Sequence, residues 1–496
     1  MPERLSPEAD WNSLYIDGEW VDADADETIG VEDPSTRERA YEVPAAAESD
    51  VDAAYEAAAA AREEWADTPP ARRREAVRNL VDAVQANRDA IQELLTVEAG
   101  GTAVMAGTSV HLALDQAEEA ATFPNRMGGV HKESNVDGKE NIVRREPKGV
   151  VTAISPWNFP LNLSMRAVAP AIATGNTVVL KPATNTPVVG GLLFGYLAEE
   201  AGIPPGVVNV VTGRGSDIGD AVAGHPESDA VAFTGSTPVG RQVAATAAEN
   251  LAVQAMELGG NNAHIVAADA DLDRAVDAAV FGSFVHQGQV CISINRHLVH
   301  ESVYDEYVDR LAERAAALPT GSAHDPDTVV GPIVDESQRD EMLGYVAETV
   351  EAGATVETGG ETVALDGVDD SLVVEPTVLS GVTNDMAAAC NEHFGPIAPV
   401  IPFSDVDEAV ELANAVEYGL SGSVHAGDLG VARDIADRMD TGMVHVNDQP
   451  INDEAHVPFS GTNASGMGGY NSETILNLLT ETKWISVQRD AREYPF

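Results

Sequence analysis

The chain carries two cysteines, and each needs its own explanation, because two thiols form neither a disulfide framework nor a four-thiolate zinc site. Cys291 ends the run HQGQVC (286–291), just after a helix that Gly288 should end. A thiol in a loop beside a helix terminus is open to exposure and reaction, whereas a structural cysteine belongs inside an apolar run. This context leaves catalysis and packing equally open for Cys291. Cys390 follows three alanines, and we interpret it as a small packed residue.

A carboxylate and an amide stand at the ends of predicted strands, which is where α/β proteins place their sites. Glu257 closes the apolar run AVQAME (252–257) and is followed by two glycines. Taken alone, it is better explained as a surface charge at a strand end. Asn158 lies in SPWNFP (155–160), where two prolines rigidify the backbone, and this run alone is equally explained as a stiff turn.

Two glycine patterns, GRGSDIG (213–219) and GSTPVG (235–240), each follow a predicted strand and open a predicted helix. The free N–H groups of a helix start are able to hold a phosphate. Neither spacing is the usual dinucleotide fingerprint, and each alone is better explained as a tight turn. Together in one parallel-sheet domain, they favour a nucleotide.

The elements that must position these residues change in character at residue 149. Runs such as GVVTAIS (149–155) and NTVVLK (176–181) lack polar alternation and are separated by helical patterns near 161–174, 187–201, 216–223 and 238–248. This pattern predicts a parallel sheet covered on both faces, that is, a doubly wound α/β domain. A second α/β series starts near residue 262.

The remaining segments predict helices and a ribbon. Helical patterns cover about 49–65, 71–98 and 102–122, and the charged run at 136–147 is typical of a protruding ribbon. The last extended piece, KWISVQ (483–488), is expected to join this ribbon or a strand of another subunit.

The composition of the chain argues against several classes of protein. The 496 residues hold 81 acidic against 29 basic side chains, a net charge of −52, and only five of the cations are lysines. Such a surface repels nucleic acid and anionic membranes, and its self-repulsion is screened in concentrated salt, so we expect a halophile's protein. No stretch approaches the roughly 18 apolar residues that span a membrane, and the start lacks a signal peptide, so we expect a cytoplasmic protein. The 12 scattered histidines predict no metal site.

Six motifs in one order resemble the aldehyde dehydrogenase superfamily over nearly the full chain. They are SPWNFP (155–160), LKPA (180–183), FTGSTPVG (233–240), ELGGNN (257–262), GQVC (288–291) and EHFGP (392–396). The resemblance implies an aldehyde dehydrogenase-like α/β fold and a homodimer or homotetramer. The resemblance implies three parts of the chain: a cofactor-binding domain (1–124 and 148–258), a catalytic domain (259–470), and an oligomerisation ribbon with the C-terminal strand (125–147 and 471–496).

The resemblance also implies roles for three catalytic residues. Cys291 would attack the aldehyde carbon, and its backbone N–H with the Asn158 amide would hold the oxyanion. Hydride transfer to the nicotinamide would leave a thioester. Glu257 would activate the water that hydrolyses this thioester, and would help deprotonate Cys291.

A nicotinamide cofactor, NAD or NADP, follows from the same resemblance. Lys181 is assigned to the adenosine ribose, Glu392 to the nicotinamide ribose, and Phe394 to packing against the nicotinamide. Gly235, Ser236 and Gly240 are assigned to the pyrophosphate helix. The full set of implied cofactor residues is Ile154, Ser155, Trp157, Lys181, Thr184, Gly215, Gly235, Ser236, Gly240, Leu258, Glu392 and Phe394.

Two positions depart from common family members. Thr184 stands where many NAD-preferring members have a glutamate, and losing that carboxylate removes repulsion against a 2′-phosphate that Lys181 can pair. We therefore predict that NADP is accepted, and we leave its preference open. Arg166 replaces a tryptophan found near the substrate entrance of many relatives. It either recognises a substrate oxygen or carboxylate, or pairs with an acid of this acidic chain.

The combination of PLNLSMR (160–166), HQGQVC (286–291) and HVNDQPINDE (445–454) is most similar to the benzaldehyde and vanillin dehydrogenase branch. It implies an aromatic aldehyde as substrate. Three alternatives stay open: a semialdehyde such as succinic semialdehyde, a coenzyme A-acylating enzyme, and a non-catalytic binding protein. The presence of Glu257 favours hydrolysis over acyl transfer.

Overall fold

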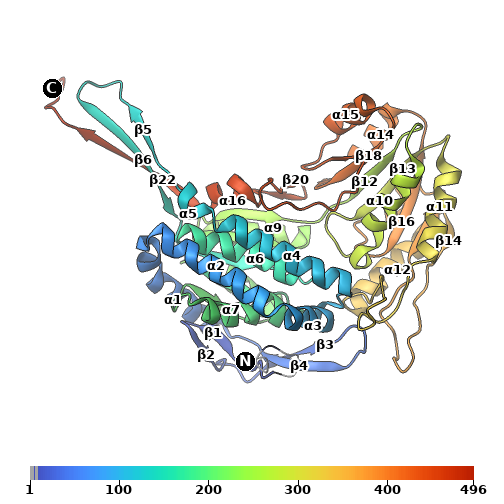
Figure 1. The fold of residues 1–496 in the computed structure, drawn as a ribbon, viewed down its shortest axis with the longest axis horizontal. Helices are drawn as coiled ribbons and strands as arrows, with labels where there is room; N and C mark the ends of the chain where they lie inside the picture. Colours follow the sequence, from blue (N-terminus) through green and yellow to red (C-terminus); the bar gives the residue numbers. More distant parts are fainter. Residues whose placement is uncertain (1–4, 6–8) are drawn as a thin grey trace.

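An eight-stranded sheet forms the centre of the larger lobe. The computed structural model describes Leu5 and residues 9–496 (Figure 1). The five central strands of the sheet run parallel, and short antiparallel strands close both edges. In spatial order the strands are β2 (Glu19–Val21), β1 (Leu14–Ile16), β9 (Val208–Val210), β8 (Thr177–Lys181), β7 (Val150–Ile154), β10 (Ala230–Thr234), β11 (Val253–Glu257) and β21 (Gly466–Met467).

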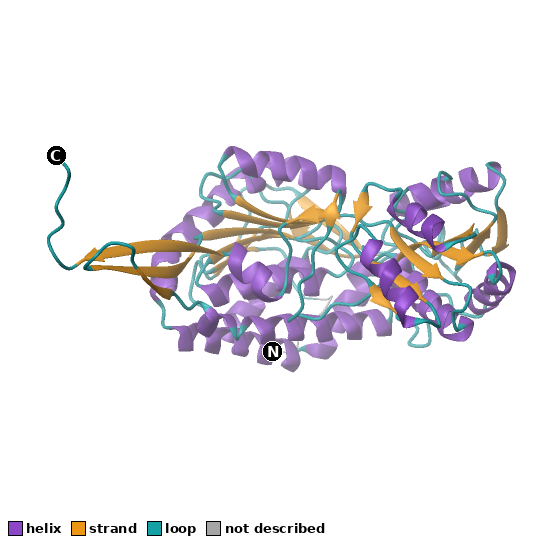
Figure 2. Ribbon diagram, turned by 90° about the horizontal axis from the view of Figure 1, so that it is seen from above, coloured by secondary structure: helices purple, strands orange, loops and turns teal. Residues whose placement is uncertain are grey.

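Alternate residues of these strands pack into different cores, which is why the runs are apolar without interruption. Val150 and Val179 belong to a cluster with α1 and α8, while Val151 and Val178 belong to a cluster with α2, α4, α6 and α7. Helices therefore cover both faces of the sheet (Figure 2), and the doubly wound prediction is confirmed. The helices of this lobe are α1 (Glu48–Asp67), α2 (Pro70–Ala86), α3 (Arg88–Ala99), α4 (Ala103–Ala120), α5 (Phe123–Arg126), α6 (Pro160–Thr174), α7 (Leu193–Ala201), α8 (Gly215–Ala223) and α9 (Thr237–Glu249).

A seven-stranded sheet forms the centre of the second lobe, and apolar clusters again lie on both of its faces. Its strands, in spatial order, are β14 (Thr355–Thr358), β15 (Thr377–Ser380), β16 (Ile397–Phe403), β13 (Ile294–His300), β12 (Asn262–Val266), β18 (Gly422–His425) and β19 (His445–Val446). The helices around it are α10 (Leu272–Phe284), α11 (Tyr304–Ala316), α12 (Glu336–Glu351), α13 (Ala387–Cys390), α14 (Val406–Asn414) and α15 (Leu429–Arg438).

A three-stranded ribbon projects from the larger lobe (Figure 1). It consists of β5 (Val130–Glu133), β6 (Lys139–Pro147) and β22 (Thr480–Gln488), and α16 (Ser472–Leu478) leads into β22. β22 pairs antiparallel with β6 over its whole length, from Thr480 opposite Pro147 to Gln488 opposite Lys139. The extended segment 483–488 therefore pairs within its own chain. Two further antiparallel pairs are β3 (Thr28–Glu32) with β4 (Arg39–Pro44), and β17 (Tyr418–Gly419) with β20 (Thr462–Asn463).

Three sequence-based expectations were wrong in detail. The single helix expected over 71–98 is two helices, because Asn87 leaves the helical conformation and its side-chain amide donates to the Ala83 carbonyl at 2.8 Å. The pattern near 187–201 begins with a π-helical turn, η2 (Val188–Leu192), before α7. Cys390 is exposed at the end of the one-turn helix α13 and is not a packed residue.

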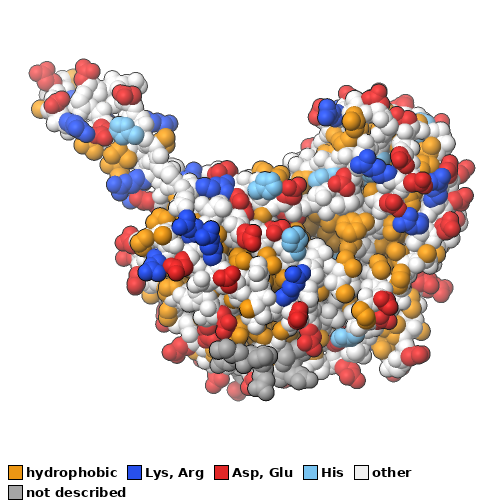
Figure 3. Space-filling model, in the orientation of Figure 1, with side chains coloured by type: hydrophobic (Ala, Val, Ile, Leu, Met, Phe, Trp, Pro, Cys, Tyr) orange, Lys and Arg blue, Asp and Glu red, His pale blue; other side chains and the backbone are white. Residues whose placement is uncertain are grey.

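Acidic side chains are spread over most of the face shown in Figure 3, including both lobes and the ribbon. In residue 5 and residues 9–496, no helix combines the length and the apolar character that crossing a membrane requires.

Candidate active site

A cavity of about 460 Å³ opens between the two lobes, above the carboxyl ends of the parallel strands. Segments that follow β7, β10 and β11 line one side, and the Cys291 loop, α12 and the segment 391–394 line the other. Its lining residues include eight of the predicted site residues: Trp157, Asn158, Gly235, Ser236, Leu258, Cys291, Glu392 and Phe394.

The Cys291 loop is held by its backbone. The Asn262 side-chain amide donates to the Cys291 carbonyl oxygen at 2.9 Å and to the Ser293 carbonyl oxygen at 2.7 Å. Gly260 packs directly on this loop, since a Cβ at that position would lie 2.4 Å from the Cys291 oxygen. The Cys291 side chain is partly exposed and packs against the apolar core of the larger lobe.

Just before this loop, η3 (Val285–Gly288) contains two residues in the left-handed region. His286 has φ 48° and Gln287 has φ 57°, and both are buried. The Gln287 amide donates to the carbonyl oxygens of Gly100 at 3.2 Å and Pro332 at 2.8 Å. A non-glycine residue in this region costs conformational energy, so the hydrogen bonds from Gln287 help to hold the approach to Cys291 in place.

Asn158 is buried at the turn between β7 and α6. Its amide nitrogen donates to the Gln289 carbonyl oxygen at 2.9 Å. A primary amide has two N–H donors, so one remains for another acceptor. Because Asn158 and Cys291 line the same cavity, this second donor is available to an oxygen that develops charge beside the thiol.

Glu257 is the last residue of β11 and is buried, and neither of its carboxylate oxygens has a hydrogen-bond partner among the described residues. Burial raises its pKa well above the ordinary value, while the Arg166 guanidinium lowers the pKa and the Asp453 carboxylate raises it. A buried carboxyl without a partner lowers the stability of the fold. Such a group in or beside a cleft is a candidate for a catalytic role.

Burial also raises the pKa of the Cys291 thiol to about 12, with smaller effects from the charges of Glu392, Arg166, Glu257 and Asp453. Of these, only the arginine lowers the pKa. The thiol is therefore protonated at neutral pH and needs a base before it can act as a nucleophile. Glu257 is a base whose charge reaches Cys291.

Glu392 lies across the cavity on the segment before β16. Its Oε1 accepts a hydrogen bond from the Gly260 N–H at 2.9 Å, and burial raises its pKa to about 7. A Cβ on Gly259 would lie 2.2 Å from its Oε2, so a side chain at that position would displace the Glu392 carboxylate. Phe394 has φ 48° and meets the Trp157 ring edge-on, with 5.4 Å between the ring centroids.

The start of α9 faces the same cavity. Ser236 is its N-cap residue, its side chain makes no capping hydrogen bond, and Gly235, Ser236 and Thr237 all line the cavity. The first N–H groups of a helix have no partner inside the helix and attract anions. Gly240, one turn into α9, packs against Leu258. This end of the cavity suits a phosphate.

The other predicted cofactor residues do not line this cavity. Lys181 is buried at the end of β8, its Nζ donates to the Pro182 carbonyl oxygen at 3.1 Å, and burial lowers its pKa to about 8. Ile154 pairs with Lys181 across β7 and β8, and the Ser155 N–H donates to the Lys181 carbonyl oxygen at 3.2 Å. Gly215 is the first residue of α8.

Thr184 lines a separate cavity of about 390 Å³. Four acidic residues and one arginine share that cavity with it: Glu32, Glu98, Asp335, Glu336 and Arg37. The surroundings of Thr184 are thus acidic even though Thr184 itself carries no charge.

Comparison with known proteins assigns the chain to a family. The sequence pattern of the aldehyde dehydrogenase family matches residues 20–485. The chain belongs to the aldehyde dehydrogenase family. It is accordingly an oxidoreductase that acts on aldehydes, and the expected α/β fold of that family is confirmed.

Two relatives and one solved structure illustrate the similarity. The chain is 42% identical over 485 residues to a benzaldehyde dehydrogenase of Bacillus subtilis, covering 98% of this chain and 99% of that protein. It is 43% identical over 476 residues to a vanillin dehydrogenase of Corynebacterium glutamicum, covering 96% and 97%. The crystal structure of a betaine aldehyde dehydrogenase from Staphylococcus aureus in complex with NAD+ superposes with a TM-score of 0.96 at 32% identity, covering 100% of this chain and 98% of that chain.

Arg166 of this dehydrogenase pairs with an acid, as one of the two sequence-based explanations expected. Its guanidinium forms a buried ion pair with Asp453. Asp453 belongs to the run HVNDQPINDE (445–454), and nothing in that run indicates that this acid reaches α6.

Two further residues of the dehydrogenase's site were missed from the sequence. Asn262 is the last residue of the motif ELGGNN, and that motif was its only signal. Arg296 is fully buried and donates to Asn261 and to the carbonyl oxygens of Leu412 and Ala413, so it fixes the loop between β11 and β12. The one signal in the sequence was an arginine within the otherwise uncharged strand segment INRHLVH (294–300).

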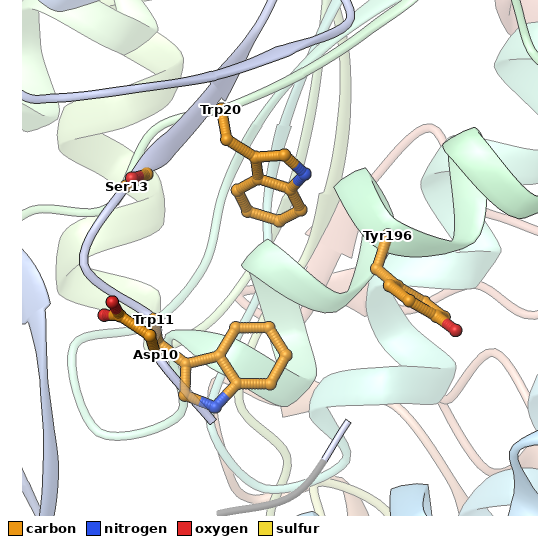
Figure 4. Close-up of a pocket in the computed structure, with 5 residues that line it drawn as sticks. All are labelled: Asp10, Trp11, Ser13, Trp20 and Tyr196. Atoms are coloured by element: carbon orange, nitrogen blue, oxygen red, sulfur yellow. The ribbon is translucent and has the colours of Figure 1, made fainter. Parts of the chain in front are cut away.

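Elsewhere in the dehydrogenase, the described residues contain no group of three or more His, Cys, Asp or Glu that is arranged to hold a metal ion. A small hollow of about 150 Å³ lies on the N-terminal segment (Figure 4). Asp10, Trp11, Ser13, Trp20 and Tyr196 line it, and it shares no residue with the cavity beside Cys291.

Proposed function

We propose that this enzyme oxidises an aromatic aldehyde to the carboxylic acid with NAD as the electron acceptor. The observation that carries the proposal is one cavity lined by a thiol, a spare amide donor and a helix start, with an unpartnered buried carboxyl whose charge reaches the thiol. Support for the substrate and cofactor comes from relatives that are named benzaldehyde and vanillin dehydrogenases, including a benzaldehyde dehydrogenase [NAD(+)] of Pseudomonas putida that is 39% identical.

In this proposal Glu257 takes the thiol proton, and the Cys291 sulfur attacks the aldehyde carbon to give a thiohemiacetal. The Asn158 amide and the Cys291 backbone N–H stabilise the oxyanion. NAD, when bound, supplies the acceptor for the hydride that leaves this carbon. Once Glu257 has released the thiol proton to solvent, it removes a proton from water, and the hydroxide attacks the thioester carbon. The carbon–sulfur bond then breaks to release the carboxylic acid, while Glu257 returns its proton to the Cys291 sulfur.

The residues present fit a dinucleotide. The start of α9, with Gly235 and Ser236, would hold the pyrophosphate, because its free N–H groups face the cavity. Glu392 and Phe394 would hold the nicotinamide half, and Lys181 with Ile154 and Ser155 would border the adenosine ribose. The buried hydroxyl of Ser155 has no partner among the described residues, which suits a site that a ligand completes.

An aromatic substrate is supported by the composition of the apolar core against which Cys291 packs. The apolar cluster on which Cys291 packs contains Phe159, Phe459 and Tyr470, with Ile451 at its margin. Aromatic walls favour a flat apolar ring through dispersion and edge-to-face contacts.

The domain division and the oligomer belong to the same proposal. The cofactor domain would comprise 1–124 and 148–258, the catalytic domain 259–470, and the association ribbon 125–147 with 471–496. Apolar side chains on the ribbon are exposed, with Trp484 at 66% and Val130 at 53%. Exposed apolar residues on a projecting sheet suit a subunit contact, so we propose a homodimer or homotetramer, which light scattering in concentrated salt would test.

An aldehyde panel tests the proposed function. Benzaldehyde and vanillin should be oxidised with NAD, without coenzyme A, at higher kcat/KM than short aliphatic aldehydes. Cys291→Ala should lower kcat by a factor of about 10⁴ or more, because it removes the nucleophile. The matched control is Cys390→Ala, which removes the exposed second thiol and should leave kcat unchanged. Equal rates for wild type and Cys291→Ala would refute the mechanism, and acid formation that requires coenzyme A would refute hydrolysis.

A further inference from the structure

The ion pair between Arg166 and Asp453 is buried within the larger lobe. Arg166 lies on α6, eight residues after Asn158, and its side chain is 3% exposed, while that of Asp453 is 8% exposed. The Arg166 Nη2 donates to Asp453 Oδ2, and Asp453 Oδ1 accepts a hydrogen bond from the Asn471 amide at 2.9 Å. Asp453 is therefore fixed from two sides.

The pair lies against two aromatic rings of the apolar core of the larger lobe, Phe459 and Tyr470, which we call the aromatic wall. The Arg166 guanidinium lies over the Phe459 ring, 4.4 Å from its centroid, and 6.0 Å from the centroid of Tyr470. Phe459 and Tyr470 are joined by two backbone hydrogen bonds of 3.1 and 2.8 Å. Both rings belong to the cluster on which Cys291 packs.

Both charges of the pair also reach the reacting groups. The Arg166 guanidinium lowers the pKa of Cys291 and of Glu257, and the Asp453 carboxylate raises the pKa of both residues. Tyr470, which lies near Arg166, also donates its hydroxyl to the carbonyl oxygen of Ala255, two residues before Glu257, at 3.4 Å. The pair is therefore close enough for its charges to act on the reacting groups.

An unpaired buried guanidinium beside the thiol would attract a carboxylate, because a planar fork of donors matches two carboxylate oxygens. Asp453 takes that place in this chain. A substrate carboxylate would lose its water shell and then face the Asp453 charge, with the Nη2 of the guanidinium already bonded to Asp453. A neutral aromatic ring meets no such cost and gains contact with the aromatic wall.

We propose that Asp453 is a specificity-determining residue, which occupies Arg166 and so restricts the site to uncharged aldehydes by rejecting aldehydes that carry a carboxylate. The inference rests on the proposed aldehyde oxidation and deepens it. In this proposal the Arg166 guanidinium would bind a substrate carboxylate if Asp453 were absent, and its pairing with Asp453 prevents that.

The wild-type enzyme gives the first test without any substitution. Benzaldehyde and 4-formylbenzoate share the ring and differ by one carboxylate, and succinic semialdehyde carries the carboxylate on an aliphatic chain. We expect kcat/KM to be at least about a hundredfold lower for both carboxylated aldehydes, in line with the cost of burying an unpaired charge. Similar kcat/KM for 4-formylbenzoate and benzaldehyde would overturn the inference. Failure to oxidise any aldehyde would refute the proposed function instead.

Substitution of Asp453 gives the second test. Asp453→Asn and Asp453→Ala should raise kcat/KM for succinic semialdehyde relative to benzaldehyde by about tenfold or more, because the guanidinium is freed. The double variant Arg166→Met/Asp453→Ala should lose this gain, since no cation remains. Asp370→Asn, which removes an acid paired with Arg339 outside the site, controls for the change in net charge and should leave the ratio unchanged.

Three results would overturn the proposal: an unchanged ratio in folded Asp453→Asn, a gain that persists in the double variant, or an equal gain in Asp370→Asn. Circular dichroism and the thermal midpoint establish folding. Should both Asp453 variants fail to fold, the comparison of benzaldehyde with 4-formylbenzoate in the wild-type enzyme still decides the inference.

Discussion

Asn262 donates its side-chain amide to the carbonyl oxygen of Cys291 at 2.9 Å, and this bond ties the first residue of β12 to the loop that carries the thiol. The same amide reaches the Ser293 carbonyl oxygen, and the Asn262 oxygen accepts from the Ser421 N–H at 2.9 Å. One side chain thus joins three segments of the second lobe at the reacting residue.

Substitution of Asn262 should separate positioning from stability. Asn262→Asp keeps the acceptor for Ser421 and loses the donors to the Cys291 loop, so we expect kcat to fall by about 10²-fold, the loss that a misplacement of about 1 Å produces. Asn79→Ala is the matched control, because its amide donates to the Ala201 carbonyl oxygen on the surface of the larger lobe. Steady-state kinetics and urea unfolding measure the two effects. A loss of stability with unchanged kcat would contradict the positioning role.

The pH dependence of turnover should reflect Glu257. Its pKa is raised by burial, and a base must be ionised to act, so kcat should increase as the pH rises from neutral towards alkaline. Glu257→Gln should lower kcat by about 10²- to 10⁴-fold and flatten this increase. A burst of reduced cofactor before the slow turnover would locate the loss in thioester hydrolysis. Glu306→Gln, an exposed residue of α11, is the control, and a pH profile shared by both variants would exclude Glu257 as the base.

Cofactor choice should depend on the acidic surroundings of Thr184. The side chain itself presents no charge to a 2′-phosphate, but Glu32, Asp335 and Glu336 line the same cavity. We therefore expect NADP to be accepted with a lower kcat/KM than NAD. Thr184→Glu should lower kcat/KM for NADP by about tenfold or more and change the value for NAD little, whereas the isosteric Thr184→Val should affect both cofactors alike. An NADP preference in the wild-type enzyme would refute this expectation.

Acid should destabilise the folded chain. Burial lowers the pKa of seven histidines below the ordinary value, so between about pH 6.5 and the lowered values the unfolded chain binds protons that the folded chain does not. Burial lowers the pKa to about 3 for His297 and to about 4 for His286 and His393. The seven histidines are His225, His264, His286, His297, His393, His425 and His445.

Four carboxyls oppose this effect, because their raised pKa values let the folded chain hold extra protons: Glu98, Asp229, Glu257 and Glu392. The histidines are more numerous, so the free energy of unfolding should fall from pH 6.5 to 5, by up to about 1.4 kcal/mol per pH unit for each net proton. Urea unfolding at fixed high salt measures it. His111→Gln, on the exposed face of α4, should leave the slope unchanged. A free energy that rises on acidification would contradict the prediction.

Concentrated salt should stabilise the protein. A net charge of −52 repels itself, and the screening length shortens from about 10 Å at 0.1 M to about 3 Å at 1 M salt. The thermal midpoint should therefore rise between 0.1 M and 2 M KCl, and activity should be retained. Sucrose of equal osmolality is the control, because it does not screen charge. A midpoint that is independent of KCl would refute the halophile interpretation.

The parallel strands and their order of appearance could be predicted from the sequence, because strands buried on both faces are apolar without interruption, as in Thr177–Lys181. The motifs around Asn158, Glu257 and Cys291 were visible as strand-end and loop residues, but only the resemblance to a family distinguished them from turns and surface charges. Cys390 was misjudged, since an apolar neighbourhood in sequence does not ensure burial at the end of a one-turn helix.

Long-range pairings were beyond the sequence. Asp453 reaches Arg166 from 287 positions away, and no local pattern specifies such a partner. The break at Asn87 was hidden for a different reason, because the apolar periodicity continues from α2 into α3 and only the side-chain bond to Ala83 marks the end of the first helix.

The ribbon imposes an order on biosynthesis. β6 pairs with β22 only after β22 has been synthesised, because Arg145 and its hydrogen-bond partner Thr480 are 335 positions apart. At roughly 5–20 residues per second, the ribosome needs roughly 20–70 s to make the intervening chain. Both sheets are complete in sequence before β22 emerges. The nascent chain can thus fold its two lobes first, and the ribbon, which we propose as the surface of association, is finished last. Assembly through the ribbon would therefore follow completion of the catalytic parts.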